Sequence, residues 1–382
     1  MPFILLKPSK SRKGIIVLKH LELFAFKSLK KRHRIEIKKK YLIGIYFGYS
    51  YILVEDIPFA DFYLAEDNVI NFINFKSSMP RCNLNGYNFL TVPIKNRNTT
   101  KLFDFLFIGN SSKRKNLIFF LNALKLTINK SKNIKLNIAL IVVHQNSYLN
   151  NYELSKCERL ISELKTEKCQ FTYIKIDAKK NFKLPKNTID LFYKNSRNLV
   201  LCSYGEGAAR VVAEAKLHGL GVLFYELTKG GSRNHFNEKY DFIFSNIEEF
   251  SRAILSSLNN KRMDQKTLDY YKTIFSETNS KQKLAEFLSY QFSFDLNELK
   301  NYFRKLNLMN SFQSHNQFLP REIPSVEKTD ECLTPSSMTR LYEYLFFGKP
   351  RIKFSFRDFN YLLKIKIDFL ISAFKYVISK YS

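Results

Sequence analysis

Between residues 103 and 226, short apolar runs alternate with segments whose apolar residues recur every three or four positions. The apolar runs have the length and near-continuous hydrophobicity of strands that are buried on both faces of a sheet. The segments between them have the period of amphipathic helices. We expect strands at 103–109, 134–143, 171–176, 198–203 and 221–226, and helices at 115–130, 151–168, just after Pro185, and at 208–218. This order predicts a doubly wound α/β domain around a parallel sheet.

In such a domain, ligands bind beyond the carboxyl ends of the strands, where the following loops converge. Three loops qualify here: those after Ile108, after Ser203 and after Glu226. We therefore look for chemistry in these three places.

The rest of the chain is less regular. Segments 42–56 and 89–94 are strand-like, and 60–75 suggests a strand that leads into a helix, so the first 95 residues suffice for half of a second α/β domain. Beyond about residue 260 the pattern turns helical, and 311–337 is a polar linker with proline and serine. The expected division is 1–95, 96–275 and a helical extension over 276–382.

The run CSYGEGAARVVAEAKLHGLGVLFYELTKGG (202–231) carries the clearest chemical pattern. A Gly-Glu-Gly turn after a strand places Glu206 at the carboxyl edge of the sheet. The backbone N–H groups of Gly207, Ala208 and the next residue then open a helix, and a helix start of this kind attracts anions such as phosphate. Glu214 lies eight residues later among apolar neighbours, where a carboxylate needs a partner. On these residues alone, Glu206 could also cap the helix and Glu214 could pair with a nearby lysine.

This run resembles the signature of the group 1 (family 4) glycosyltransferases, in which two glutamates eight residues apart follow a strand. The alanine after the second glutamate, the glycine before the next strand and the Gly-Gly loop at Gly230 and Gly231 also match. The resemblance implies a GT-B fold. It also implies that Glu206 contacts the hydroxyls of the donor sugar and that Glu214 takes the ribose hydroxyls of the nucleotide.

A second segment, FLFIGNSSKRKNLIFFLNAL (105–124), resembles the strand, loop and helix with which the same family holds the donor diphosphate. The resemblance places Lys115 on the lysine that contacts this group. The family's arginine position holds Asn110 instead, and its glycine after the lysine is Asn116. Lys113 or Arg114 could compensate for the missing charge, and of the two only Arg114 carries a guanidinium. The best-matching part spans 103–245, and we expect a shortened amino-terminal domain with no glycine-rich loop of its own.

Charge is concentrated at the two ends of the chain. Residues 1–50 hold 13 Lys or Arg against 2 acids and residues 340–382 hold 9 against 3, whereas residues 201–250 hold 5 against 7. Basic ends rich in phenylalanine suit an anionic membrane surface, although solvated lysine faces would look the same. A nucleic-acid partner is not expected, because the aromatic residues keep core spacing and do not interleave with the basic runs.

Other features exclude further classes of protein. No apolar stretch is long enough to span a membrane, and the first residues lack the order of a signal peptide. The five cysteines are scattered without a Cys-x-x-Cys pair, which argues against zinc and against a disulfide framework. We expect a cytoplasmic protein that can also bind peripherally to the inner face of the cell membrane.

Taken with the resemblance, these features imply a metal-independent, retaining glycosyltransferase that uses a nucleoside diphosphate sugar. The implied acceptor is a lipid-linked or cell-surface glycan. A different class stays open, namely a catalytically inactive, glycosyltransferase-like binding subunit, because Asn110 and the short amino-terminal domain both depart from the family pattern.

Overall fold

The structure is a computed structural model of the 382-residue chain. It describes residues 3–19, 26, 29, 31–46, 59–65, 79–84, 88–90, 101–131, 133–144, 148–177, 184–206, 209–228, 231–259 and 263–306. The strand and helix expectations for 47–56, 66–75 and 91–94, the linker at 311–337 and the tail after it lie outside this part.

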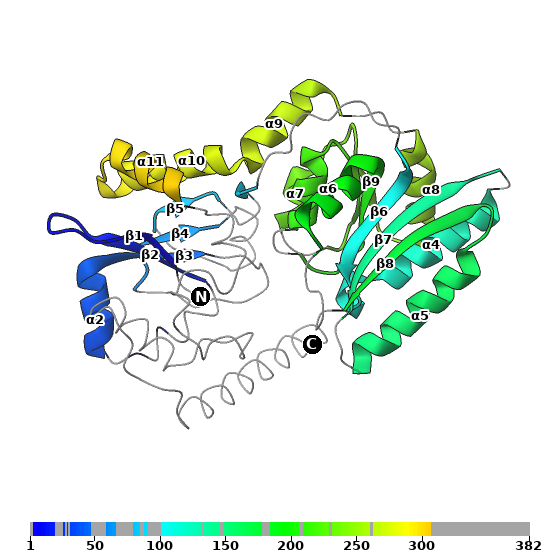
Figure 1. The fold of residues 1–382 in the computed structure, drawn as a ribbon, viewed down its shortest axis with the longest axis horizontal. Helices are drawn as coiled ribbons and strands as arrows, with labels where there is room; N and C mark the ends of the chain where they lie inside the picture. Colours follow the sequence, from blue (N-terminus) through cyan, green and yellow to red (C-terminus); the bar gives the residue numbers. More distant parts are fainter. Residues whose placement is uncertain are drawn as a thin grey trace.

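The described residues form two sheets, each in its own lobe (Figure 1). The lobe drawn at the right holds the sheet expected from the sequence, and six of its strands are described. They are β6 (Phe103–Asn110), β7 (Leu136–His144), β8 (Cys169–Asp177), β9 (Ser196–Leu201), β10 (Gly221–Tyr225) and β11 (Phe242–Phe244).

This sheet is parallel throughout and has the spatial order β11-β10-β9-β6-β7-β8. Counted along the chain from β6, the order across the sheet is 6-5-4-1-2-3, which is that of a Rossmann-type domain. The first strand of this sheet, β6, lies in its middle. Strands β7 and β8 extend the sheet on one side of β6, and β9, β10 and β11 extend it on the other. The predicted α/β class and all five predicted strands are confirmed, whereas β11 was not foreseen.

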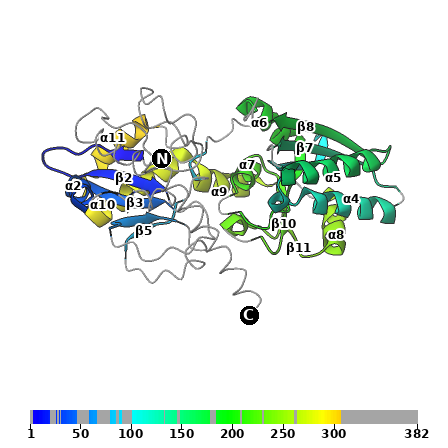
Figure 2. The same cartoon turned by 90° about the horizontal axis from the view of Figure 1, so that it is seen from below.

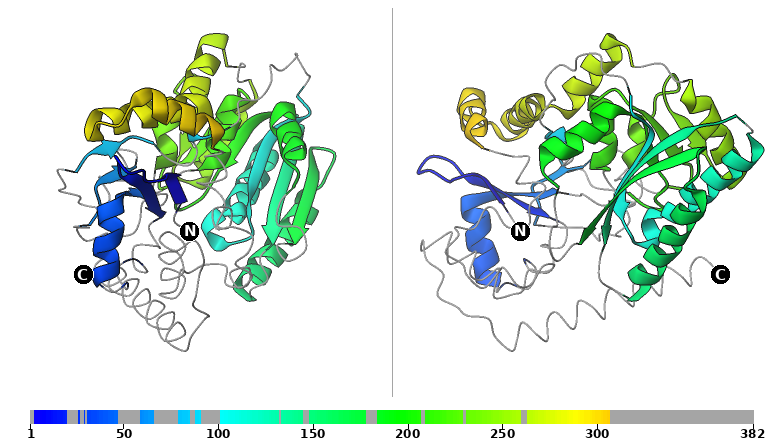
Figure 3. Two further views of the ribbon diagram at one scale, coloured as in Figure 1. Left: turned by 60° about the vertical axis from the view of Figure 1, so that its left-hand side comes forward. Right: turned by 45° about the vertical axis from the view of Figure 1, so that its right-hand side comes forward.

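Helices cover both faces of the sheet, as the near-continuous apolar strands require. One face packs against α4 (Leu117–Lys130), α5 (Tyr148–Leu164) and α8 (Ile247–Leu258), which lie together on one side of β6 to β8 in Figure 3. The other face packs against α6 (Lys186–Asn195) and α7 (Arg210–Leu217). Helix α7 ends as expected at a glycine, because Gly219 has a φ of +75° that disfavours other residues.

The start of α7 differs from the expectation. The sequence predicted a helix from Ala208, whereas the described helix begins at Arg210 with Ala209 as its extended N-cap residue. Gly207 and Ala208 lie outside the described residues. The apolar repeat set by Val212 and Ala215 is the same from either start, so periodicity could not separate them.

The lobe at the left in Figure 1 contains β1 (Phe3–Leu6), β2 (Gly14–Lys19), β3 (Tyr41–Tyr46), β4 (Phe62–Leu64) and β5 (Arg81–Cys82), with α2 (Lys31–Lys40) before β3. The five strands lie in chain order, and only β1 is antiparallel to its neighbour. Gly14 begins β2 because a Cβ there would lie 2.6 Å from the carbonyl oxygen of Leu6 and 2.7 Å from the ring of Tyr41.

The helices that follow the lobe with the six-stranded sheet return to this amino-terminal lobe. Helix α9 (Gln265–Phe275) lies between the lobes in Figure 2, and α10 (Glu277–Phe292) and α11 (Leu296–Lys305) share a core with β1, β2, β4 and β5. Arg12, in the β1–β2 connection, pairs with Glu298 of α11, with its Nε 3.1 Å from Oε2. The helical segment after residue 276 therefore packs against the amino-terminal sheet over its described length.

Candidate donor site at the sheet switch point

The candidate site lies where the strand order of the six-stranded sheet reverses, between β6 and β9. Loops that follow these two neighbouring strands leave in opposite directions along the sheet and open a crevice between them, in which ligands of doubly wound domains bind. The loop after β6 carries Arg114 and Lys115, and the turn after β9 carries Gly205 and Glu206. Two of the three expected loops thus meet at the expected edge.

The loop after β6 is shaped by a short 3-10 helix, η2 (Lys113–Lys115), and by the residue that follows it. Asn116 has φ 55° and ψ 39°, which is the left-handed region. Glycine enters this region without strain, and asparagine is among the few other residues that visit it regularly. The asparagine at the family's glycine position therefore keeps the backbone conformation that a glycine would serve.

Two hydrogen bonds tie this loop to the turn after β9. The backbone N–H of Tyr204 donates to the carbonyl oxygen of Arg114 at 3.0 Å, and the Arg114 guanidinium donates to the carbonyl oxygen of Gly205 at 2.9 Å. The guanidinium expected to face the donor thus braces the backbone next to Glu206.

Lys115 and Glu206 form an ion pair across the crevice, between Nζ and Oε1. Their side chains are 16% and 11% exposed, so most of the pair is shielded from water. The lysine stem lies beside Gly109 at the end of β6, where a Cβ would be at ordinary contact distance, 3.5 Å, from Cγ of Lys115. The two residues that the resemblance makes catalytic are thus brought together by segments 91 positions apart.

Glu214 lies on α7 and uses both carboxylate oxygens. Its Oε2 accepts from the hydroxyl of Tyr193 on α6 at 3.0 Å, and its Oε1 accepts from Nε of Arg210 at 2.6 Å. Tyr193 is fully buried, and burial, followed by the charge of Glu214, raises its pKa well above the usual value, so the phenol stays a donor. No lysine partner for Glu214 is found among its described contacts.

Asn110 ends β6 and turns toward its own loop. Its Oδ1 accepts from the backbone N–H of Ser112 at 3.3 Å and from the Ser112 hydroxyl at 2.6 Å. Of the remaining predicted residues, Gly230 lies outside the described part of the chain together with Gly207 and Ala208. Gly231 begins η3 (Gly231–His235).

A second charged pair lies beneath α7, away from these loops. Lys216 and Asp241 are fully buried and pair through Nζ and both carboxylate oxygens. Asp241 also accepts from the backbone N–H groups of Val222 at 2.8 Å and Asn237 at 2.7 Å. The pair joins α7 to the segment that leads into β11.

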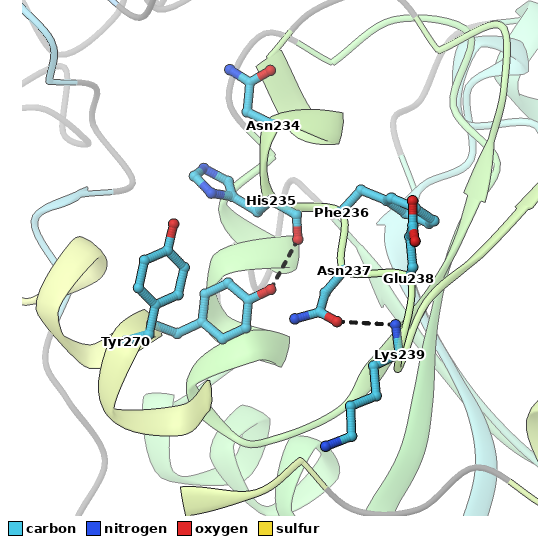
Figure 4. A pocket seen from close by; sticks show the side chains of 8 residues that line it. Asn234, His235, Phe236, Asn237, Glu238, Lys239 and Tyr270 are labelled. Atoms are coloured by element: carbon cyan, nitrogen blue, oxygen red, sulfur yellow. Dashed lines mark hydrogen bonds between the residues drawn. The ribbon is translucent and has the colours of Figure 1, made fainter. Parts of the chain in front are cut away.

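A cavity of about 640 Å³ lies beside this segment and is drawn in Figure 4. Its lining contains none of the residues that the sequence assigned to the donor, and comes from the end of η3, the connection to β11 and helix α9. In the described part of the chain, no helix has the length and apolar character needed to cross a membrane. No group of three or more His, Cys, Asp or Glu residues that could hold a metal ion occurs there either.

Comparison with known proteins decides the family. Residues 91–273 match the model "Glycosyl transferases group 1", which covers both switch-point loops and both glutamates. Residues 91–273 therefore form a group 1 glycosyltransferase domain. A comparison with curated proteins finds no match.

The fold of this glycosyltransferase is similar to that of solved structures. The lipopolysaccharide outer core galactosyltransferase WaaB in its apo form superposes with a TM-score of 0.51 at 16% identity, over 72% of this chain and 75% of that one. The Anabaena protein HepE in complex with UDP gives a TM-score of 0.49 at 13% identity, over 68% of this chain and 81% of that one. The match to WaaB confirms the GT-B fold expected from the resemblance.

Two residues of this glycosyltransferase escaped sequence reasoning, Arg210 and Tyr193. Arg210 stands four positions before Glu214 on the same helix, a spacing at which opposite charges pair. That signal was present in the sequence. Tyr193 gave none, because its contact with α7 arises only from the packing of α6 beside it.

Proposed function

We propose that this glycosyltransferase moves a sugar from a nucleoside diphosphate sugar to a hydroxyl acceptor with retention at the anomeric carbon. The observation that carries the proposal is the meeting of Lys115 and Glu206 at the switch point, beside the start of α7. In this arrangement a cation, a carboxylate and a helix N-terminus face the position where an anionic ligand of a Rossmann-type domain lies.

Each residue takes the role that the resemblance implies. The Lys115 ammonium neutralises charge on the departing diphosphate, so the reaction proceeds without a metal ion. Glu206 orients the donor sugar through its hydroxyls. Glu214 accepts hydrogen bonds from the ribose, because a carboxylate has about four acceptor positions and only two are used by Tyr193 and Arg210.

Gly207, Ala208, Gly230 and Gly231 complete the donor site in this proposal through their backbone N–H groups. Glycine at three of these positions lets the backbone approach the phosphates and the sugar closely. Asn110 contributes hydrogen bonding within the loop that precedes Lys115, and Arg114 contributes rigidity to the turn that carries Glu206.

We further propose a lipid-linked or cell-surface glycan acceptor, reached at the cytoplasmic face of a membrane. Support comes from the basic, phenylalanine-rich residues 338–382, which would bind anionic headgroups. Deleting these residues should weaken binding to phosphatidylserine vesicles and reduce its salt dependence. Unchanged vesicle binding by the soluble deletion variant would contradict the membrane assignment and leave donor chemistry untouched.

The donor proposal is tested with the full chain. A panel of nucleoside diphosphate sugars is screened by thermal shift, because a ligand that binds the folded state raises the melting temperature by mass action. Release of nucleoside diphosphate is then followed with the stabilising donor. Stabilisation together with release supports the enzyme, stabilisation without release supports the inactive binding subunit, and no stabilisation by any donor contradicts both.

A further inference from the structure

The side chains near the switch point that could bind an anionic ligand include Asn110, Arg114 and Arg210, and they differ in charge and in the contacts that they already make. We propose that Arg210 binds the donor phosphate next to the ribose and is the guanidinium of the diphosphate site. The inference rests on the function proposed above. It adds a residue to which the family resemblance gives no role.

The family's arginine position supplies no positive charge in this chain. Asn110 stands there, and its side-chain oxygen is held by the Ser112 hydroxyl at 2.6 Å and by the Ser112 backbone N–H at 3.3 Å. An amide fixed in this way serves its own loop. The charge must come from another residue.

Arg114 is nearest in sequence but is already used in building the site. Its guanidinium donates to the carbonyl oxygen of Gly205 at 2.9 Å, and its own carbonyl oxygen accepts from Tyr204. Breaking these bonds to reach a phosphate would loosen the turn that positions Glu206. Arg114 therefore suits a bracing role.

Arg210 has a position suited to phosphate. It is the first residue of α7, where the helix dipole and the backbone N–H groups without a partner inside the helix favour anions. Its Nε lies 2.6 Å from Oε1 of Glu214, the carboxylate assigned to the ribose. Since the first phosphate is joined directly to the ribose, a group beside Glu214 and at the start of α7 lies next to that phosphate.

The exposure of this ion pair points the same way. The Arg210 side chain is 41% exposed and that of Glu214 is 19% exposed, so the guanidinium forms the outer part of the pair. A guanidinium has five N–H donors in a planar fork, and it can hold a carboxylate along one edge while presenting another to a phosphate. A lysine could not do both with fixed geometry.

Charge balance supports the assignment. Among the residues that make the contacts described above, Lys115 pairs with Glu206 and Arg210 pairs with Glu214, while Arg114 donates to a neutral carbonyl oxygen. Three cations therefore stand against two carboxylates, and without Arg210 this set would have no surplus of positive charge. A diphosphate brings several negative charges, so it is bound best where such a surplus exists.

Inorganic pyrophosphate is the probe, because it tests the phosphate contacts whatever the nucleobase or sugar. Its binding to the full-length protein is measured by isothermal titration calorimetry at fixed ionic strength. Arg210→Met should weaken pyrophosphate binding at least tenfold, and Arg210→Lys should recover only part of this loss. Arg197→Met is the matched control, because Arg197 is 43% exposed and also ion-paired, with Asp104, but lies at the opposite edge of the sheet.

Each outcome has one meaning. Weaker binding by Arg210→Met with unchanged binding by Arg197→Met supports the inference. Equal pyrophosphate affinity in wild type and Arg210→Met, with only a lower melting temperature, overturns it and assigns Arg210 to stability, while the proposed function stands. Failure of the wild type to bind pyrophosphate or any nucleoside diphosphate would instead contradict the proposed function itself.

Discussion

Replacing Lys115 by methionine should slow sugar transfer far more than it weakens donor binding. The methionine keeps most of the lysine stem, so the packing over Gly109 is retained while the charge is lost. Loss of one pre-organised group that stabilises developing charge costs about 10²-fold or more in turnover. This corresponds to about 2.7 kcal/mol in the activation barrier.

The structure explains why ground-state binding should change less. In the protein without donor, the Lys115 ammonium already has a carboxylate partner in Glu206, and both side chains are largely shielded from water. Donor binding therefore exchanges one anionic partner for another and gains little. As the bond to the sugar breaks, the diphosphate gains negative charge, and the lysine then contributes more to the transition state than to the ground state.

The assay separates the two quantities. Donor dissociation constants are measured by calorimetry, and turnover is followed as release of nucleoside diphosphate at saturating donor. Lys125→Met is the matched control, because Lys125 lies on α4 and pairs with Glu163 at 2.9 Å, outside the switch-point loops. Thermal melting is recorded first, because Lys115→Met leaves the Glu206 carboxylate without its lysine.

Two results would refute this reasoning. Turnover within about threefold of wild type would show that the phosphate contact lies on another residue. A loss of donor affinity equal to the loss of kcat/KM, with kcat unchanged, would show uniform binding rather than stabilisation of the transition state. Lys115→Arg keeps a positive charge, and should it fold like wild type, it should retain more turnover than the methionine variant.

The remaining predictions concern Glu214, the buried ion pair and one histidine. Glu214→Ala should weaken nucleoside diphosphate binding by about 1.5–3 kcal/mol while the far-ultraviolet circular dichroism stays the same, and unchanged affinity in calorimetry would make Glu214 structural. Lys216→Met should lower the free energy of unfolding by about 3–5 kcal/mol in urea titrations, because it leaves Asp241 buried without its ion-pair partner. The double variant Lys216→Met/Asp241→Asn should recover part of this loss. An equal or larger loss in the double variant would refute this explanation. Burial, and then Lys216, lower the pKa of His235 to about 4, so the folded state keeps His235 neutral while the unfolded state binds a proton below about pH 6.5. The free energy of unfolding should therefore be highest above pH 6.5 and fall by up to about 3 kcal/mol as the pH falls toward 4. His235→Phe should flatten that part of the stability profile, and an unchanged profile would contradict this explanation.

The six-stranded sheet could be predicted because several of its strands, such as β6, β7 and β10, are apolar along almost their whole length. Segments such as 103–109 and 134–143 had to be covered on both sides, and only a parallel sheet between helices does this. The short strand Phe242–Phe244 escaped because three residues carry no period, and it is recognised only by its pairing with β10.

The amino-terminal lobe was harder to predict for a physical reason. Its strands are short, and β4 and β5 have three and two residues, so their hydrophobic pattern resembles that of loops. Helices α10 and α11 show amphipathic spacing, but spacing identifies an apolar face and not the surface that covers it. Their packing against β1 and β2, through a chain that leaves one lobe and returns to the other, is a property of the tertiary fold.

The candidate site divides in the same way. Lys115 and Glu206 could be paired from the sequence, because each follows a central strand and loops at one sheet edge converge. The role of Arg114 could not, because its bond to the Gly205 carbonyl depends on how two loops meet. The spacing of Arg210 and Glu214 permits an ion pair but does not indicate a site, since such pairs on exposed helices contribute only about 0.3–0.5 kcal/mol.

The two departures from the family pattern, Asn110 and Asn116, therefore do not by themselves indicate a loss of function. Asn116 keeps the left-handed backbone of the glycine it replaces, with φ 55°. Asn110 removes a charge from the loop after β6, while Arg210 places one at the start of α7, on the other side of the same crevice. If the two changes compensate, the anion would be held from the β9 side as much as from the β6 side, and Lys115 would remain the cation closest to the bond that breaks. Stability alone does not require the shielded Lys115–Glu206 pair, because a pair of apolar residues at these positions would stabilise the fold at least as well. The presence of the pair therefore favours an active enzyme over an inactive relative.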